Sequence, residues 1–334
     1  MSTSDARGEH GQQSPRDSRP AHSPHRKHDM PPAARRGRVA VAMAGGLVVG
    51  VAVVLGTVAV TTTPAATQPI SRHVVADDPV AALQQPVQQA IPARPVTDAE
   101  LANLPQATTF GTVTDAAPDA TPQADTTGIV AHPTASVPVY SAPGGPAIAA
   151  APAQQVFGAP PMPSTPTWLP VIDQQPGWIR VLLPVRPNHA TGWLSTQDSG
   201  IVTARTPYRI EVDRSSFTLS LYKDDHRVGQ WTVGVGKLAQ SGPAESITPA
   251  GRTFLLGDVQ EEHPTYSPVI MPLGAHSDTY TTYGGGPGTV GVHTWLSGGD
   301  VYGRNSSDGC VRVPPDALQI LSTTVPLGTT VLIK

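Results

Sequence analysis

VGVHTW at residues 290–295 and SSDGCVRV at residues 306–313 carry the features that decide how this chain folds. The apolar run before His293 predicts a short strand that ends at the histidine, and the Gly-rich stretch after it predicts a loop that folds back. The second run predicts a strand beside the first, which brings Cys310 near His293. Thiolate is the nucleophilic form of cysteine, and a neighbouring imidazole accepts the thiol proton or lowers the thiol pKa. Cys310 and His293 are therefore a candidate catalytic dyad.

Cys310 is the single cysteine of the chain, so an intramolecular disulfide is excluded. The alternative interpretation is a buried structural thiol beside a hydrogen-bonded core histidine. Three neighbouring residues favour the catalytic interpretation. Gly309 permits close backbone approach, Ser307 offers a hydroxyl, and Arg312 shares a strand face with Cys310, since residues two apart in a strand point the same way. A substrate carboxylate would fit beside that guanidinium.

The two stretches resemble the catalytic signature of the L,D-transpeptidases, whose YkuD-type domain has a histidine, a spacer, then Ser-His-Gly-Cys, an apolar residue and often arginine. TPAGRTF at residues 248–254 resembles that family's Thr-Pro-x-Gly start of a strand, and VGVG at 233–236 resembles an earlier strand of the family. The resemblance covers residues 206–334, with its motifs in the family's order.

The chain departs from the family pattern at two positions. Asp308 stands where the family has its second histidine, and Thr294 stands where a glycine often follows the first histidine. The role of general base therefore falls on His293 alone.

The resemblance implies a peptidoglycan L,D-transpeptidase that cuts a tetrapeptide stem before its terminal D-alanine and joins the acyl group to an amine of a second stem. It also implies that carbapenems acylate the cysteine. The predicted catalytic residues are Cys310, His293 and Gly309, and the predicted substrate-binding residues are Arg312, Ser307, Tyr283, Tyr280 and Thr294.

The Pro/Gly-rich passage before His293 corresponds to the family's lid over the active site, and the resemblance places Tyr280 or Tyr283 along the cleft. We interpret His263 and His276, in the same passage, as solvent-exposed loop histidines. No pair of His or Cys residues has the spacing of metal ligands, so no metal site and no cofactor are predicted.

Composition and charge are unevenly distributed along the chain. Its 32 glycines and 37 prolines in 334 residues are more than a chain made only of folded core contains. Residues 1–38 carry eight Lys/Arg and four Asp/Glu, although the whole chain has a formal net charge of -3. This basic tail has no aromatic residues to stack on bases, which argues against a nucleic-acid partner.

Residues 39–60 are 22 residues without a charge, enough for a helix that spans the roughly 30 Å hydrocarbon core of a membrane. Three arginines directly precede the run, so the positive-inside rule predicts a cytoplasmic N-terminus and an external catalytic domain in a single-pass protein. The alternative is a cleaved signal peptide, whose apolar core is normally shorter, about 7 to 15 residues.

Residues 61–127 are rich in Pro, Ala, Gln and Thr and predict a spacer, with a short helix at 98–103. Residues 128–200 show short β runs separated by turns, which is typical of a small barrel. Their Gly-Trp-Ile at 177–179 and Gly-Trp-Leu at 192–194 resemble the bacterial Src-homology-3-like domains of cell-wall enzymes. We predict that the tryptophans lie in the barrel core.

Residues 204–334 predict a mainly β catalytic domain, for which the resemblance implies the L,D-transpeptidase β-sandwich. Alternating apolar residues at 208–212 and 217–222 predict a hairpin, and 314–321 predict a helix with proline in its first turn. Further strands are predicted at 228–235, 252–256, 268–271, 290–293, 310–313 and 329–333.

Three other interpretations remain. A sortase also carries His, Cys and Arg, but its motif is Thr-Leu-x-Thr-Cys and its histidine lies farther from the cysteine. Papain-like peptidases place the cysteine before the histidine. A non-catalytic wall-binding protein with a degenerate site belongs to a different class, and reaction of Cys310 with a carbapenem distinguishes it from an enzyme.

Overall fold

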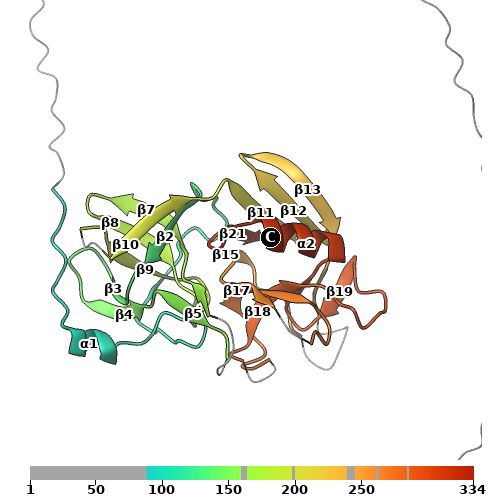
Figure 1. The fold of residues 1–334 in the computed structure, drawn as a ribbon, viewed down its shortest axis with the longest axis horizontal. Helices are drawn as coiled ribbons and strands as arrows, with labels where there is room; N and C mark the ends of the chain where they lie inside the picture. Colours follow the sequence, from blue (N-terminus) through green and yellow to red (C-terminus); the bar gives the residue numbers. More distant parts are fainter. Residues whose placement is uncertain (1–88, 159–163, 198–199, 239–244, 261–262, 284–285) are drawn as a thin grey trace, which may run out of the picture. The chain divides into compact units, whose positions relative to one another are not determined.

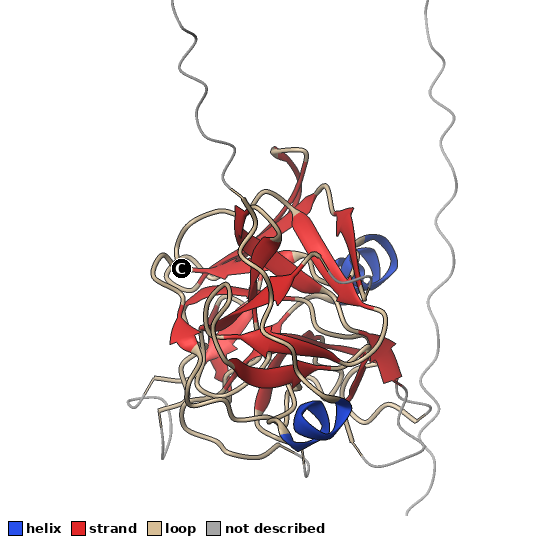
Figure 2. Ribbon diagram, turned by 90° about the vertical axis from the view of Figure 1, so that its left-hand side faces the viewer, coloured by secondary structure: helices blue, strands red, loops and turns tan. Residues whose placement is uncertain are grey.

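The computed structural model describes residues 89–158, 164–197, 200–238, 245–260, 263–283 and 286–334. The predicted basic tail and the apolar stretch 39–60 lie outside these ranges. Within them, no helix has the length and apolar character needed to cross a membrane. Strands dominate the described residues, as predicted, and the helices are short (Figure 2).

The first part of the described chain is built around one eight-stranded sheet of order β10-β2-β7-β8-β9-β3-β4, with β1 paired to β9, while β5 and β6 pair separately (Figure 1). Its elements are α1 (Asp98–Asn103), β1 (Ala117–Pro118), β2 (Ile129–Pro133), β3 (Val137–Tyr140), β4 (Ala147–Ala151), β5 (Gln154–Val156), β6 (Ser164–Pro166), β7 (Leu169–Gln175), β8 (Trp178–Leu182), β9 (Ala190–Ser195) and β10 (Ile201–Arg205). The predicted helix α1 is confirmed. It begins with a capping box, in which Thr97 and Glu100 satisfy each other's backbone N–H groups.

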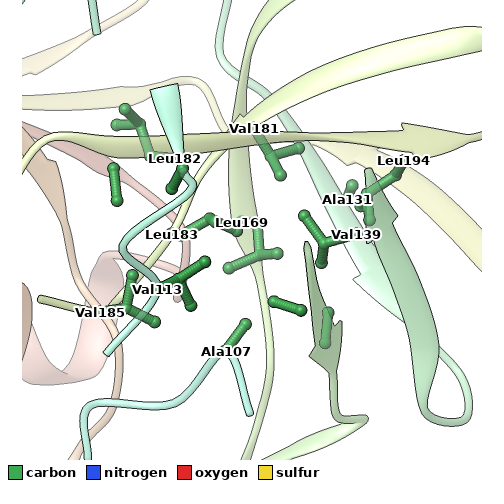
Figure 3. Packing of buried hydrophobic residues seen from close by; sticks show 14 of the residues in the cluster. Ala107, Val113, Ala131, Val139, Leu169, Val181, Leu182, Leu183, Val185 and Leu194 are labelled. Atoms are coloured by element: carbon green, nitrogen blue, oxygen red, sulfur yellow. The ribbon is translucent and has the colours of Figure 1, made fainter. Parts of the chain in front are cut away.

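Alternating apolar residues of these strands make the first core, with Leu169, Val139 and Leu183 among its members (Figure 3). Trp178 is buried, as predicted, and its indole N–H donates to the Ile91 carbonyl at 2.7 Å. The prediction does not hold for Trp193, which is only half-buried. The strands predicted in this region are confirmed within a few residues. The Src-homology-3-like identity and the boundaries 128–200 and 204–334 stay predictions, because contacts join 77–334 into one compact unit.

The last part of the chain forms a five-stranded sheet of order β13-β12-β11-β21-β15 and a six-stranded sheet of order β16-β17-β18-β20-β14-β19. Its elements are β11 (Tyr208–Asp213), β12 (Thr218–Lys223), β13 (His226–Thr232), β14 (Gly234–Gly236), β15 (Gly251–Phe254), β16 (Val259–Gln260), β17 (Val269–His276), β18 (Thr289–His293), β19 (Arg304–Ser307), β20 (Val311–Arg312), α2 (Pro315–Thr324) and β21 (Thr330–Ile333). The predicted hairpin is confirmed, since β11 and β12 pair antiparallel.

Both sheets contribute to one second core. Ile210 and Leu219 come from the five-stranded sheet, Val290 and Val311 come from the six-stranded sheet, and Leu318 comes from α2. Side chains alternate between the two faces of a strand, and residues three or four apart share one face of a helix. The apolar side chains of these strands and of α2 therefore face the same interior. The site strands β18 and β20 are therefore held from behind by a packed apolar layer.

The predicted spacer is wrong over its last part. Ala107 and Val113 are fully buried members of the first core. Asp119 forms a buried ion pair with Arg252 of β15, with Oδ2 2.5 Å from Nε. Small apolar residues and a single acid gave no periodic signal in the sequence, whereas their partners lie more than 100 positions away along the chain.

Candidate active site

Strand β18 ends at His293 and Cys310 directly precedes β20, and both predicted catalytic residues line one cavity. The strands run parallel, with Val292 opposite Val311 and His293 opposite Arg312, so the prediction of a second strand beside the first is confirmed. Gly309 directly precedes Cys310 and has φ of 122°. Glycine tolerates this backbone conformation, in which an L side chain would be strained.

A cavity of about 310 Å³ opens at this point. Its lining includes five of the predicted site residues, namely Cys310, His293, Arg312, Ser307 and Tyr283. It is completed by Phe157, Val259, Tyr266, Ile270, Pro272, Gly286, Pro287, Gly288, Thr289, Gly291, Trp295 and Asp308. The other predicted residues, Gly309, Tyr280 and Thr294, are not part of the lining.

His293 is held in one tautomer by the residue after it. Its Nδ1 lies 2.6 Å from the Thr294 carbonyl, and because a carbonyl only accepts, Nδ1 carries the hydrogen and Nε2 keeps its lone pair. The Tyr266 ring meets the imidazole edge-on at 5.0 Å. Burial lowers the pKa of His293 to about 4. The imidazole is therefore neutral at physiological pH and able to accept a proton.

Cys310 is partly exposed, and its thiol is neutral at rest. Burial raises the pKa of the thiol, while a hydrogen bond from the Gly291 backbone and the charge of Arg312 act in the opposite direction. With His293 also neutral, the pair has the protonation of a general base beside an undissociated nucleophile.

Hydroxyl groups brace the turn that carries Cys310. Ser307 Oγ donates to the Cys310 carbonyl at 2.5 Å and accepts from the Gly309 N–H at 3.2 Å. Thr248 Oγ1 donates to the Gly309 carbonyl at 2.8 Å and accepts from the Gly236 N–H at 2.9 Å. The threonine of the Thr-Pro-x-Gly motif thus ties the glycine strand β14 to the cysteine turn.

Asp308, which replaces the family's second histidine, is fixed from two sides. Its carboxylate forms an ion pair with Lys237 at 2.9 Å, and its carbonyl accepts a short hydrogen bond from the Tyr283 hydroxyl. Burial raises the pKa of Tyr283 to about 12, so the phenol keeps the proton that it donates. Tyr280 supports this arrangement, since its ring lies 5.6 Å from that of Tyr283.

Arg312 supplies the positive charge of the cavity. Its guanidinium lies over the Trp295 ring at 3.9 Å and donates through Nη1 to the Ser306 carbonyl at 2.8 Å. Its Nε is buried and has no hydrogen-bond partner among the described residues. A buried donor without a partner is costly. Arg312 lines the cavity, where its positive charge would attract an anionic group.

The predictions for the two loop histidines have opposite outcomes. His263 is exposed, as predicted. The prediction for His276 is wrong, because it is fully buried and its Nε2 donates to the Thr109 carbonyl at 2.7 Å. Burial lowers the pKa of His276 to about 4. No local pattern could have paired it with a threonine from the predicted spacer.

Phe157 and Tyr266 are cavity residues that sequence reasoning missed. Phe157 follows β5 in the first part of the chain, and its ring packs so closely on Gly257 that an added Cβ there would lie 2.4 Å from it. No motif marks either aromatic. Within the described ranges, no group of His, Cys, Asp and Glu residues has the arrangement of a metal site.

Residues 207–333 match YkuD, the model of the L,D-transpeptidase catalytic domain. No curated protein matches this chain. Among solved structures, a mutant L,D-transpeptidase of Enterococcus faecium is 21% identical over 38% of this chain and 50% of its own, with a TM-score of 0.30. One from Mycobacterium smegmatis is 15% identical over 47% of this chain and 90% of its own, with a TM-score of 0.30.

The L,D-transpeptidase LdtMt1 in complex with imipenem is 15% identical over 50% of this chain and 72% of its own, again with a TM-score of 0.30. The finding that bears on classification is the match at residues 207–333, where this segment of the chain is similar to the L,D-transpeptidase catalytic domain.

Proposed function

We propose that this protein is a peptidoglycan L,D-transpeptidase with Cys310 as the nucleophile and His293 as the general base. One observation carries the proposal: Cys310, a histidine that carries its hydrogen on Nδ1 and an arginine line the same cavity, within a segment that matches the catalytic domain of this family. The substrate is a stem peptide of the cell wall, and the reaction is acyl transfer from one stem to another.

The first half of the reaction forms a thioester. Sγ of Cys310 bonds to the carbonyl carbon of the third stem residue as the thiol proton passes to Nε2 of His293. Collapse of the tetrahedral intermediate breaks the amide C–N bond, and His293 returns the proton to the departing amine of D-alanine.

The second half regenerates the enzyme. An amine of another stem attacks the thioester carbonyl, His293 takes up the amine proton, and the released sulfur receives it back as a thiol. The new amide cross-links the two stems. The thioester conserves the energy of the amide that was cut, so no nucleotide is needed, and no metal or cofactor takes part.

Backbone donors at the cysteine turn stabilise the oxyanion of each tetrahedral intermediate. The Gly309 N–H already donates to Ser307 Oγ, so we assign the main contribution to the Cys310 N–H and give Gly309 the role of shaping the turn. A single donor of this kind contributes about 3 to 4 kcal/mol to transition-state stabilisation in other enzymes.

A charged and an apolar part of the cavity lining both contribute to substrate recognition. Arg312 offers its positive charge to a substrate carboxylate, with the guanidinium plane held by Trp295. Val259, Ile270 and Phe157 form an apolar wall that suits the methyl group and methylene chain of a stem peptide. Thr294 acts through His293, whose Nδ1 it fixes.

The apolar run at residues 39–60 supports a membrane anchor, with the N-terminus in the cytoplasm and the catalytic domain facing the cell wall. Within this proposal the preceding residues 128–200 act as a Src-homology-3-like domain near the wall polymer. Carbapenems are the expected inhibitors, since attack of Cys310 Sγ on their strained lactam carbonyl, with the thiol proton passing to His293, gives the same acyl-enzyme chemistry.

The test is turnover of muropeptides by the full chain. With a tetrapeptide-stem muropeptide as both donor and acceptor, we expect release of D-alanine and a cross-linked dimer, both measured by mass spectrometry. Cys310→Ala abolishes both products, and His293→Gln slows them by about 100-fold or more. A folded wild-type chain that binds the muropeptide and releases no D-alanine would identify a wall-binding module instead.

A further inference from the structure

Arg186 lies outside the L,D-transpeptidase domain, in the connection between β8 and β9 of the first sheet. Its main chain is held by the segment before that sheet: its N–H donates to the Gly111 carbonyl at 3.0 Å, and its carbonyl accepts from the Val113 N–H at 2.9 Å. The base of the side chain is therefore fixed to the N-terminal part of the molecule, beside the fully buried Val113.

The guanidinium of Arg186 reaches into the catalytic domain and hydrogen-bonds to main-chain carbonyls there. Nη1 donates to the Ser277 carbonyl at 3.1 Å, and Nη2 donates to the carbonyls of Tyr280 and Pro287 at 3.3 and 3.2 Å. Residues 277–283, named here the tyrosine loop, thus take two of its bonds. The rigid fork of an arginine suits several acceptors at once.

Asn188, two residues on, holds the start of the same loop. Its Nδ2 donates to the His276 carbonyl at 2.8 Å, and its Oδ1 accepts from the His276 N–H at 2.8 Å. Nδ2 also lies 3.0 Å from a carboxylate oxygen of Asp278. One short connection of the first sheet therefore supplies the amide and the guanidinium that fix the tyrosine loop.

The far end of the tyrosine loop touches the nucleophile turn. The Tyr283 hydroxyl donates to the Asp308 carbonyl, and a Cβ added at Gly309 would lie 3.2 Å from that hydroxyl. Tyr283 also lines the cavity with Cys310. A continuous set of contacts runs from Arg186 through the loop backbone to the residue two positions before the nucleophile.

We propose that Arg186 is a positioning residue that holds the tyrosine loop against the turn of Cys310, so that reaction at the thiol depends on the sheet that precedes the catalytic domain. The part concerning reaction rests on the proposed function. The part concerning the loop stands on the contacts alone, and the two parts are tested separately.

The loop is tested by hydrogen–deuterium exchange on the full chain. Arg186→Met keeps the length of the side chain and removes its donors. We expect amides in peptides covering 277–283 and the turn at 308–310 to exchange about 10-fold faster or more. Arg180→Met is the matched control, because Arg180 donates to Thr191 and to the Pro118 carbonyl within the first part of the chain. Equal exchange of these peptides in Arg186→Met and wild type overturns the proposal, whatever the activity.

The effect on the thiol is tested by the rate at which imipenem acylates Cys310, followed by intact mass. Arg186→Met should slow acylation about 10-fold in the wild-type background and less than about twofold in a Tyr283→Phe background, since both changes break the same set of contacts. Equal slowing in both backgrounds would mean general destabilisation and would overturn the positioning role. If Arg186→Met fails to fold, Arg186→Lys takes its place. Lysine keeps the positive charge but lacks the planar guanidinium with its several donors, so we expect a smaller slowing of acylation. Absence of acylation in the wild type contradicts the proposed function, while the exchange experiment still decides the contact of Arg186 with the loop.

Discussion

Cys310 and His293 lie in the cavity in the forms that burial favours, a neutral thiol and a neutral imidazole. Burial raises the pKa of the thiol and lowers the pKa of the imidazole to about 4. The attack therefore begins from an undissociated pair, and the thiol proton moves as the sulfur bonds to the carbonyl carbon. A stable thiolate–imidazolium pair would need a lowered pKa for the thiol and a raised pKa for the imidazole.

This protonation state predicts a particular pH dependence for the thiol. His293 stays neutral well above its pKa of about 4, so the base is not lost at neutral pH. The thiolate fraction rises about tenfold per pH unit below the thiol pKa. We expect the alkylation rate of Cys310 by iodoacetamide to rise steadily from about pH 6 to about pH 9, measured by intact mass with Cys310→Ala as the control. A plateau that begins below neutral pH contradicts this account.

Single residues also mark the limit of sequence reasoning. The cysteine, the histidine and Arg312 could be identified because their spacing along two short strands places them together. His276 could not be interpreted correctly, since its hydrogen-bond partner Thr109 lies 167 positions away. Local pattern predicts what lies on one strand or on neighbouring strands, and it carries little information on distant partners.

At the scale of elements, strands with apolar alternation were predictable and polar strands were not. β19 (Arg304–Ser307) has the sequence RNSS and was not predicted, since it begins in the predicted loop, yet it pairs parallel with β14. The β5–β6 pair, QQV with STP, is equally short and polar. Backbone hydrogen bonds hold these strands in place. Because such bonds do not depend on hydrophobic side chains, these strands show no pattern of apolar residues in the sequence.

The β5–β6 pair matters for function because it carries Phe157 to the cavity wall. We expect Phe157→Ala to raise KM for the tetrapeptide stem about 3- to 10-fold with little change in kcat, because the ring contributes binding surface and touches no reacting group. Phe110→Ala, at a phenylalanine that is 51% exposed and absent from the cavity lining, is the control. Steady-state kinetics decide the matter, and a fall in kcat at unchanged KM would contradict the wall role.

At the scale of the whole molecule, a buried ion pair joins the segment before the first sheet to the catalytic domain. Arg252 on β15 and Asp119 are both almost fully buried, with two contacts at 2.5 and 2.8 Å. Because Arg252 is buried, the N-terminal segment supplies the charge that compensates it. The predicted spacer is therefore in part a structural element of the domain that it precedes.

Removing that charge should destabilise the fold. Asp119→Ala leaves a buried guanidinium without its partner, and such changes lower the free energy of unfolding by about 3 to 5 kcal/mol. Asp125→Ala is the matched control, since Asp125 is 65% exposed and lies 3.8 Å from Arg209. We expect less than about 1 kcal/mol there. Urea unfolding measures both, and equal values for the two variants would contradict a compensating role for Asp119.

Acid should loosen the molecule where the tyrosine loop meets the first sheet. The pKa of His276 is lowered to about 4 in the folded state, so as pH falls below about 6.5 the unfolded chain takes up the proton first and stability decreases until about pH 4. The loss attributable to this histidine is at most roughly 3 kcal/mol. His276→Gln keeps a donor for the Thr109 carbonyl and should flatten the fall in melting temperature over that range. His263→Gln, at an exposed histidine, serves as the control, and an unchanged pH slope in His276→Gln would show that His276 does not titrate as described.

The most direct test of the central claim is the intact mass of the full chain after incubation with imipenem. The account predicts one adduct per wild-type chain, no adduct in Cys310→Ala, and formation about 100-fold slower or more in His293→Gln. A folded wild-type chain that gains no mass, or an adduct that persists in Cys310→Ala, would contradict the assignment of Cys310 as the nucleophile.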